Sequence, residues 1–247
     1  MINQYRNNIM DDLDIYHVIQ PIIDLDRNNV FGYEMLLRSR EFNNPELLLK
    51  KAEESNQLYE LDMHSIRKAF ETINNKANTL NGLYIFINIL PSTIGNPASF
   101  KKIEQLKSSL KLTTGSVVLE LTEERKEAEL EMCVRMVDEI KNKGFLIALD
   151  DIGKGESTLP YVIELEPNIV KLDQYFSRDL ANSPKKQKAI ELLFHLIDEE
   201  TIMILEGIEN EADLQAAKKL GVRYAQGYHL GKPQVLNYYL ANSEQVV

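Results

Sequence analysis

The sequence is poor in cysteine and contains no tryptophan, and Cys133 is its single thiol. One cysteine cannot form an internal disulfide, and the same count excludes a zinc module built on several thiolates. No window reaches the roughly 18 uninterrupted apolar residues that a membrane-spanning helix needs, and the N-terminus lacks the apolar stretch of a secretory signal. We therefore expect a cytoplasmic protein that does not associate with a membrane.

Positive charge is also scarce, with 28 lysines and arginines against 38 aspartates and glutamates and a formal net charge of −10. Such an acidic chain repels polyanions, which disfavours DNA or RNA polymers as partners. Glycine and proline, at 11 and 8 residues, are too few for a flexible linker or a fibrous repeat. We expect residues 1–247 to form a single domain, with residues 1–14 as an N-terminal extension.

Short β-rich runs alternate with helical patterns along the chain. Several runs, such as LYIFI and FLIAL, are almost continuously apolar, as expected of strands that are covered on both faces. The fold class predicted is α/β, a (β/α)₈ TIM-like barrel. Only six residues, DLDRNN, separate the first two runs, which is too short for a parallel crossover, so strand 1 should run antiparallel to the others. The eight predicted strands are residues 15–23, 30–33, 83–87, 116–119, 146–149, 168–170, 202–205 and 222–225.

The helices between these strands are marked by caps and apolar stripes. Ser183 and Pro184 predict one helix start, and Asn210 and Gly221 predict the two ends of another helix. Cys133 lies on an apolar stripe of helical spacing and is expected in the core.

Nearly every predicted strand ends in a polar side chain, and barrel enzymes place their chemistry at the carboxyl ends of the strands. Any one of these residues is more often a helix cap or half of a salt bridge. Their recurrence at equivalent positions is not explained by independent capping. The residues are Glu34, Asn88, Glu120, Asp150, Asp151, Lys171, Glu206 and Gln226.

Five carboxylates in one barrel mouth would repel one another unless a cation lay among them. Ligands that are all oxygen favour Mg²⁺ or Mn²⁺ over zinc. The adjacent pair Asp150 and Asp151 would support two ions about 3.5 to 4 Å apart, as in enzymes that cleave phosphate esters. Arg38 would hold a phosphate, and Lys171 would position a water molecule or offset charge. The histidines have no ligand spacing and are assigned to surface or core packing: His17, His64, His195 and His229.

The series of motifs resembles the EAL-domain family of bacterial phosphodiesterases that hydrolyse cyclic di-GMP. The resemblance covers nearly the whole chain, and the motifs stand in the family's order. They are QPII at Gln20, YEMLLR at Glu34, LD at Asp62, FIN at Asn88, LELTE at Glu120, LDDIGKGESTL at Asp150, VKLD at Lys171, LEGIE at Glu206 and QGYHLGKP at Gln226.

The resemblance implies a barrel with an antiparallel first strand, the product pGpG, and two Mg²⁺ or Mn²⁺ ions per site, with Ca²⁺ inhibitory. The resemblance leaves open whether the chain forms a homodimer. By similarity, Lys171 would hold the nucleophilic water, with Glu34 and Glu206 also in catalytic roles, and Glu123 would tether the loop after Asp151. The remaining implied roles are the first metal for Glu34, Asn88, Glu120 and Asp150, the second metal for Asp150, Asp151 and Glu206, and substrate contact for Arg38, Gln226, Gln20 and Asp173.

The chain departs from the family pattern at two places. Met35 occupies the middle of the Glu-Ala-Leu signature, and strand alternation predicts that it points away from the metals. In the loop, DDIGKGESTL replaces a pattern resembling DDFGTGYSSL, which places Ile152, Lys154 and Glu156 at changed positions.

The leading hypothesis is a metal-dependent phosphodiesterase that hydrolyses cyclic di-GMP to linear pGpG with water activated by two metals. The alternative is a catalytically weak domain that binds cyclic di-GMP as a receptor, because the changed loop would fail to support turnover. A third hypothesis is a protein-interaction module, but that usually accompanies lost metal ligands, and every one is kept here.

Overall fold

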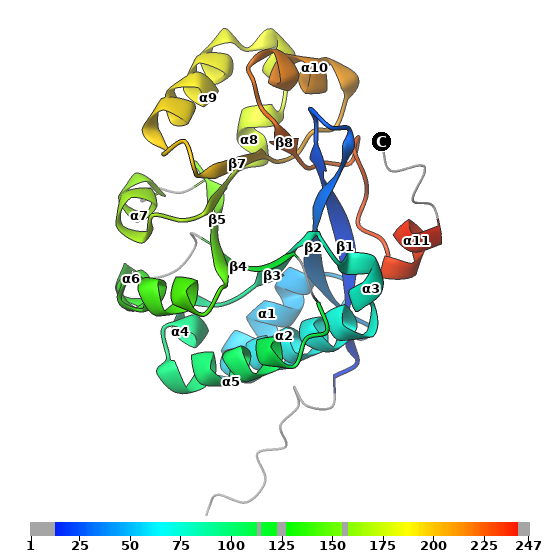
Figure 1. The fold of residues 1–247 in the computed structure, drawn as a ribbon, viewed down its shortest axis with the longest axis vertical. Helices are drawn as coiled ribbons and strands as arrows, with labels where there is room; N and C mark the ends of the chain where they lie inside the picture. The colour runs from blue at the N-terminus through cyan, green and yellow to red at the C-terminus, as the bar shows by residue number, and fades with distance from the viewer. Residues whose placement is uncertain (1–12, 113–114, 123–126, 155–157, 242–247) are drawn as a thin grey trace, which may run out of the picture.

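Eight strands close into a barrel in the computed structural model of the chain, which describes residues 13–112, 115–122, 127–154 and 158–241 (Figure 1). Each strand pairs with the next, and the last closes on the first. The strands are β1 (Ile15–Asp24), β2 (Asn29–Ser39), β3 (Tyr84–Asn88), β4 (Ser116–Thr122), β5 (Leu146–Ile152), β6 (Ile169–Leu172), β7 (Ile202–Leu205) and β8 (Tyr224–Ala225).

Strand β1 runs antiparallel to both of its neighbours, β2 and β8, whereas the pairs from β2–β3 to β7–β8 are all parallel. The cause is the short connection between β1 and β2, which permits only a hairpin. This confirms the orientation that loop length predicted. The hairpin register places Gln20 directly opposite Glu34.

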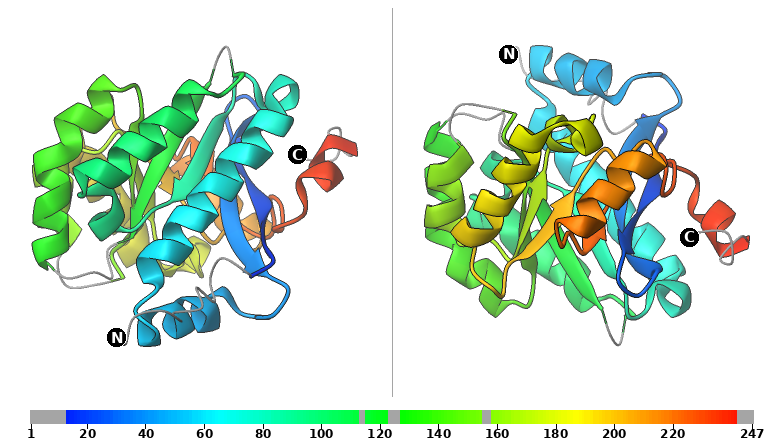
Figure 2. Two further views of the ribbon diagram at one scale, coloured as in Figure 1. Left: turned by 90° about the horizontal axis from the view of Figure 1, so that it is seen from below. Right: turned by 90° about the horizontal axis from the view of Figure 1, so that it is seen from above.

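Helices surround the barrel on its outside (Figures 1 and 2). Near the C-terminal end, α11 packs Tyr239 against Tyr33 of β2, with 5.7 Å between the ring centroids. None of the helices in the described ranges is both long and apolar enough to cross a membrane. The helices are α1 (Pro45–Glu54), α2 (Leu58–Asn75), α3 (Ala77–Leu80), α4 (Pro91–Ile94), α5 (Pro97–Ser108), α6 (Glu127–Asn142), α7 (Thr158–Leu165), α8 (Gln174–Ser177), the 3₁₀ turn η1 (Leu180–Asn182), α9 (Pro184–Leu196), α10 (Glu211–Lys219) and α11 (Leu236–Ala241).

Side chains alternate between the two faces of each strand, so the barrel has an inner and an outer core. The outer core lies between the strands and the helices and contains Cys133, which is 1% exposed, as predicted. Met35 also belongs to this outer core, so it points away from the barrel interior as alternation predicted. The inner core is a layer of six buried residues from six strands: Ile22, Phe86, Val118, Ala148, Ile169 and Ile204.

Several predicted strand ends and one helix cap need correction. β4, β5 and β6 continue to Thr122, Ile152 and Leu172, past their predicted ends, and β8 begins at Tyr224 rather than at residue 222. β2 continues to Ser39, not to residue 33, because its whole length pairs with β1 and a polar residue that faces the barrel interior does not end a strand. Ser183 begins α9, but its side chain forms no capping hydrogen bond, and its backbone carbonyl accepts from the Gln187 amide instead. The cap at Asn210 is confirmed, since its side chain accepts a hydrogen bond from the Asp213 amide.

Candidate active site at the barrel mouth

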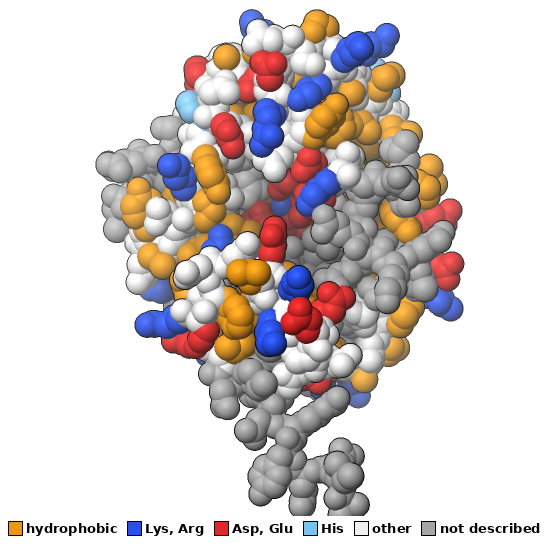
Figure 3. Space-filling view, turned by 180° about the vertical axis from the view of Figure 1, so that it is seen from behind, with side chains coloured by type: hydrophobic (Ala, Val, Ile, Leu, Met, Phe, Trp, Pro, Cys, Tyr) orange, Lys and Arg blue, Asp and Glu red, His pale blue; other side chains and the backbone are white. Residues whose placement is uncertain are grey.

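The polar residues at the strand ends form a second layer inside the barrel, directly above the inner core. Because side chains on one face of a strand recur every second residue, each polar residue lies two positions beyond an inward-facing one. On the side opposite to the view of Figure 1, acidic side chains gather in a central hollow (Figure 3). The pairs are Gly32 and Glu34, Phe86 and Asn88, Val118 and Glu120, Ala148 and Asp150, Ile169 and Lys171, Ile204 and Glu206, and Tyr224 and Gln226.

Lys171 is the centre of this layer. Its side chain is fully buried, and its Nζ forms ion pairs with four carboxylates. It lies 2.7 Å from Glu206 Oε1, 3.2 Å from Asp150 Oδ1 and 3.3 Å from Glu34 Oε2, and it also pairs with Glu120 Oε1. One positive charge therefore faces four negative groups in a site of low dielectric constant.

This imbalance is visible in the pKa values. Burial raises the pKa of Glu120 well above its ordinary range, against the opposing effect of the Lys171 charge. Burial likewise raises the pKa of Glu206 to about 8, again opposed by Lys171 and reinforced by Asp150 and Glu34. Burial alone would lower the pKa of Lys171, but the surrounding carboxylates raise it well above its ordinary value. Both glutamates thus resist ionisation, because the effect of burial exceeds the opposing effect of the Lys171 charge.

Buried oxygen atoms without hydrogen-bond partners indicate that the site is suited to a cation. In the described part of the chain these include Glu120 Oε2 and Gln226 Oε1, together with Asp150 Oδ1, whose contact with Lys171 is an ion pair only. Such atoms are costly to bury unless something binds them. Carboxylate and amide oxygens are the ligands that Mg²⁺ and Mn²⁺ prefer, so the residues present fit these ions.

The carboxylates form two groups in which the ligand oxygens lie within 4.8 Å of one another. We call Glu34, Glu120 and Glu206 the buried group, and Asp150, Asp151 and Glu206 the turn group. Glu206 belongs to both, although the sequence placed it with the second ion only. Asn88 joins the buried group through a hydrogen bond of 3.5 Å from its Nδ2 to Glu34 Oε1.

The turn group depends on an irregular stretch of β5. The pairing of β5 with β6 shifts register between Leu149 and Ile152, and Asp151 has a φ of 58°, which is unusual for a residue other than glycine. Burial and the Asp150 charge raise the pKa of Asp151. Lys154 opposes this rise, with its Nζ 3.1 Å from Asp151 Oδ2. The sequence marked Lys154 as a departure but did not predict this ion pair.

Two predicted substrate residues contact the mouth or its rim. Gln226 Nε2 donates to Glu34 Oε2 at 2.7 Å, while its amide oxygen is buried without a hydrogen-bond partner among the described residues. Gln20 is buried and donates from Nε2 to the carbonyl of Gly231 at 3.0 Å. Gln226 therefore belongs to the carboxylate cluster, whereas Gln20 fixes the segment that follows β8.

The side chains of Arg38 and Asp173 form hydrogen bonds with the backbone. Arg38 follows Glu34 on the same face of β2, and its Nη1 donates to the Leu37 carbonyl at 2.8 Å. Together with Asn88 and Asp62 it lines a cavity of about 200 Å³ at the edge of the mouth. Asp173 caps α8, since its Oδ1 accepts from the Tyr175 amide at 2.8 Å.

Glu123 and Glu156 lie outside the described residues, so the predicted tether between Glu123 and the loop stays a prediction. Asp62 is a residue whose role the sequence did not assign. Its Oδ2 accepts from the Leu90 amide at 3.1 Å and so holds the backbone beside Asn88. The LD motif at Asp62 was the sequence signal that could have identified this residue.

The histidines lie apart from the carboxylate cluster, as predicted. His17 Nε2 lies 3.1 Å from Ser65 Oγ of α2, and burial together with the nearby Arg38 charge lowers the pKa of His17 to about 4. His64 is buried on α2, whereas His195 and His229 are on the surface.

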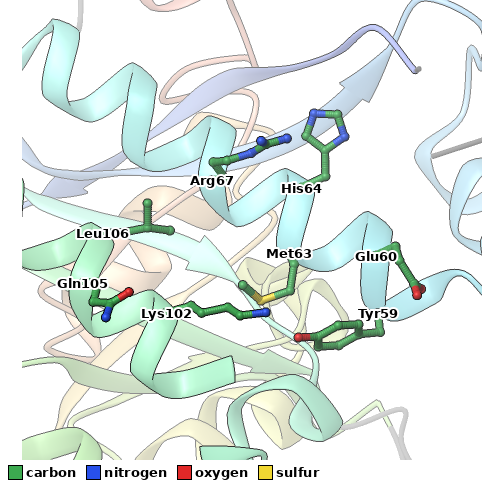
Figure 4. A pocket seen from close by; sticks show the side chains of 8 residues that line it. All are labelled: Tyr59, Glu60, Met63, His64, Arg67, Lys102, Gln105 and Leu106. Carbon is green, nitrogen blue, oxygen red and sulfur yellow. The ribbon is translucent and has the colours of Figure 1, made fainter. Parts of the chain in front are cut away.

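A separate groove of about 470 Å³ lies between α2 and α5 on the outside of the barrel (Figure 4). Its walls carry Arg67 and Lys102 among apolar side chains such as Met63 and Leu106. Its single carboxylate, Glu60, points away from Lys102 in Figure 4. This groove therefore lacks the converging carboxylates of the mouth.

Known proteins share this fold. A crystal structure of an EAL domain protein from Listeria monocytogenes superposes with a TM-score of 0.82 at 23% identity, covering 99% of this chain and 100% of that one. A standalone versatile EAL protein from Vibrio cholerae, solved in a form with c-di-GMP bound, gives a TM-score of 0.76 at 26% identity, covering 90% and 93%.

The curated relatives are longer than this chain. PdeB of Shewanella oneidensis, named a cyclic di-GMP phosphodiesterase, is 28% identical over 218 residues, which cover 85% of this chain and 25% of that protein. Across the most similar curated relatives, the chain spans 25% to 45% of their length. The EAL domain model matches residues 3–233, and the chain therefore belongs to the EAL domain family.

Proposed function

We propose that the chain is a metal-dependent phosphodiesterase that hydrolyses cyclic di-GMP to linear pGpG. The observation that carries this proposal is the convergence of five carboxylates and Asn88 at one mouth, where four of the carboxylates pair with the buried Lys171 and acceptor oxygens are left without hydrogen-bond partners. The relatives named as cyclic di-GMP phosphodiesterases and the c-di-GMP-bound Vibrio cholerae structure support the choice of substrate.

Two divalent cations, Mg²⁺ or Mn²⁺, would be held at the mouth. Glu34, Asn88, Glu120 and Asp150 would hold the first, and Asp150, Asp151 and Glu206 the second. Cations bound there would neutralise the phosphodiester and lower the pKa of water. Because the pKa of Glu206 is about 8 in the metal-free protein, binding would release its proton at neutral pH.

The chain's own residues would position the reactants. Lys171 is buried beside the carboxylates, so its Nζ can donate a hydrogen bond to the attacking water and hold it in line with the scissile phosphorus. Gln226, whose buried amide oxygen has no hydrogen-bond partner among the described residues, and Arg38, at the edge of the mouth, would contact the dinucleotide. Gln20 and Asp173 would support substrate binding at the rim of the mouth, because their side chains hold the backbone there. Glu123, in the proposed role of loop tether, would act on Asp151 indirectly.

A receptor role is the second candidate, and one observation favours it. Lys154 pairs with Asp151, one of the carboxylates required for a second cation. A protein that fills this group poorly would bind cyclic di-GMP and turn it over slowly.

Product chromatography decides between the two functions. Purified protein incubated with cyclic di-GMP and Mn²⁺ should release pGpG, whereas the same protein in Ca²⁺ or with Glu34→Gln should not. Binding of cyclic di-GMP without any pGpG in Mn²⁺ or Mg²⁺ would overturn the enzymatic proposal and establish the receptor.

A further inference from the structure

The turn that follows β5 places the positively charged side chain of Lys154 beside the carboxylates of the turn group. Lys154 and Asp151 are joined twice, by the 3.1 Å ion pair of their side chains and by a 3.1 Å hydrogen bond from the Lys154 amide to the Asp151 carbonyl. Gly153 lies between them with a φ of 97°, and a side chain there would collide with the Phe176 ring. The backbone thus presents Lys154 to the Asp151 carboxylate in a fixed turn.

The two lysines at the mouth divide the carboxylates between them. Lys171 pairs with Glu34, Glu120, Asp150 and Glu206, while Asp151 pairs with Lys154. The Lys171 side chain is fully buried, but that of Lys154 is 48% exposed. A partly exposed ion pair contributes little stability, so a competing cation can open it.

We propose that Lys154 is an internal competitor of the second divalent cation, holding Asp151 in an ion pair that this cation must break. The inference rests on the proposed function, because it assumes that the turn group is a metal site. It makes the two cation sites unequal, with the buried group filling first.

The competition has a cause in simple electrostatics. A divalent ion at the turn group needs the Asp151 carboxylate, which Lys154 already contacts at Oδ2, and it also meets the positive charge of the ammonium. Because exposed ion pairs are weak, the penalty should be about threefold to tenfold in the affinity for the second ion. Affinity for the first ion should change by less than about twofold, since Lys154 forms no ion pair with the buried group among the described contacts.

The test is a titration of the substrate-free protein with Mn²⁺. Electron paramagnetic resonance of the free ion and calorimetry measure the binding. The parent should show one tighter and one weaker Mn²⁺. Lys154→Met should tighten the weaker ion about fivefold, whereas Lys154→Arg, which keeps the charge, should behave like the parent. Unfolding midpoints of all variants confirm that each is folded.

A matched control is Lys143→Met. Lys143 pairs with Glu104 at 2.7 Å with a side-chain exposure of 42%, close to that of Lys154, but this pair lies outside the barrel, where Lys143 directly follows α6 and Glu104 is in α5. It should leave both Mn²⁺ affinities unchanged. Equal affinities of the weaker ion in the parent and Lys154→Met, or an equal gain in Lys143→Met, would overturn the competition.

Glu120→Gln separates this outcome from a failure of the proposed function. Glu120 lies in the buried group, so the variant should lose the tighter Mn²⁺. If that loss is seen while Lys154→Met changes nothing, the metal site stands and only the competition falls. If the parent binds no Mn²⁺, the proposed function falls as well.

Discussion

The buried group and the turn group share Glu206 but are constructed differently. Glu34 and Glu120 stand within regular strands, each beyond a residue of the inner barrel, and their counter-ion, Lys171, is fully buried. Asp151 stands at a register shift with a left-handed backbone, and its counter-ion is partly exposed. Regular strands therefore position Glu34 and Glu120 of the buried group, whereas the position of Asp151 in the turn group depends on an irregular backbone.

The two groups should also differ in how much free energy of unfolding is lost when an ion pair is broken. A buried charge that loses its partner is left in a site of low dielectric constant, where the loss is large. An exposed charge that loses its partner is solvated by water, where the loss is small. The variants below test whether the two groups differ in this way.

The largest effect is expected from Glu34→Gln in the buried group. Replacing a metal ligand should exceed the 10- to 100-fold loss typical of residues behind the ligands, so we expect pGpG release to fall by more than about a hundredfold. Stability of the metal-free protein should hold or rise, because the change removes charge repulsion. Progress curves and an unfolding midpoint measure the two quantities.

The matched control is Asp24→Asn. Asp24 is the last residue of β1, beside the hairpin turn and at the end of the barrel opposite to the mouth. Asp24 is 3% exposed and accepts a 2.8 Å hydrogen bond from Arg223 Nη2. This variant should lose stability and keep its turnover number. If instead Glu34→Gln unfolds the protein and Asp24→Asn inactivates it, the mouth is not the active site.

The next largest effect should come from Lys171→Met. Its removal leaves four carboxylates without a cation, and breaking a buried ion pair costs about 3–5 kcal/mol of unfolding free energy. Denaturant titration in the presence of a chelator measures this loss, and added Mn²⁺ should reverse part of it. A loss below about 1 kcal/mol would mean that the buried group is solvated like an exposed one.

The pH dependence of stability should follow Glu206. Its pKa is about 8 in the folded protein against an ordinary 4.5, so between these values the folded state holds more protons than the unfolded chain. The free energy of unfolding of the metal-free protein should therefore fall as pH rises through this window, by at most about 1.4 kcal/mol per unit.

Glu206→Gln should make this fall smaller, and the difference between the two proteins isolates the Glu206 contribution from those of Glu120 and Asp151, whose pKa values burial also raises. The comparison is clearest from pH 6.5 to 8, because His17, with its pKa lowered to about 4, makes stability rise with pH below 6.5. Parallel curves for the parent and Glu206→Gln would show that Glu206 is ionised in the folded protein at neutral pH.

The smallest effect on stability is expected from Lys154→Met in the turn group. Removing a partly exposed ion pair should change the unfolding free energy by less than about 1 kcal/mol. Denaturant titration beside Lys171→Met gives the contrast directly. Equal losses in the two variants would erase the distinction between the groups.

The sequence predicted the regular part of the site. A polar residue after each apolar run predicted that Asn88, Glu120, Asp150 and Lys171 meet at one mouth, and loop length predicted the antiparallel β1. Local pattern could not show that β2 continues past Glu34, because long-range pairing with β1 sets its end. Nor could it show the Lys154 to Asp151 pair, which depends on the left-handed backbone of Asp151.

The central claim is that the carboxylates at the mouth hold a divalent cation. A crystal soaked in Mn²⁺ and measured for anomalous scattering at the manganese edge tests it most directly. We predict a peak bounded by Glu34, Asn88, Glu120 and Asp150 oxygens at about 2.0–2.2 Å, with the Lys171 ammonium moved aside. Anomalous density absent from the mouth at saturating Mn²⁺, with Lys171 still paired to all four carboxylates, would contradict the account.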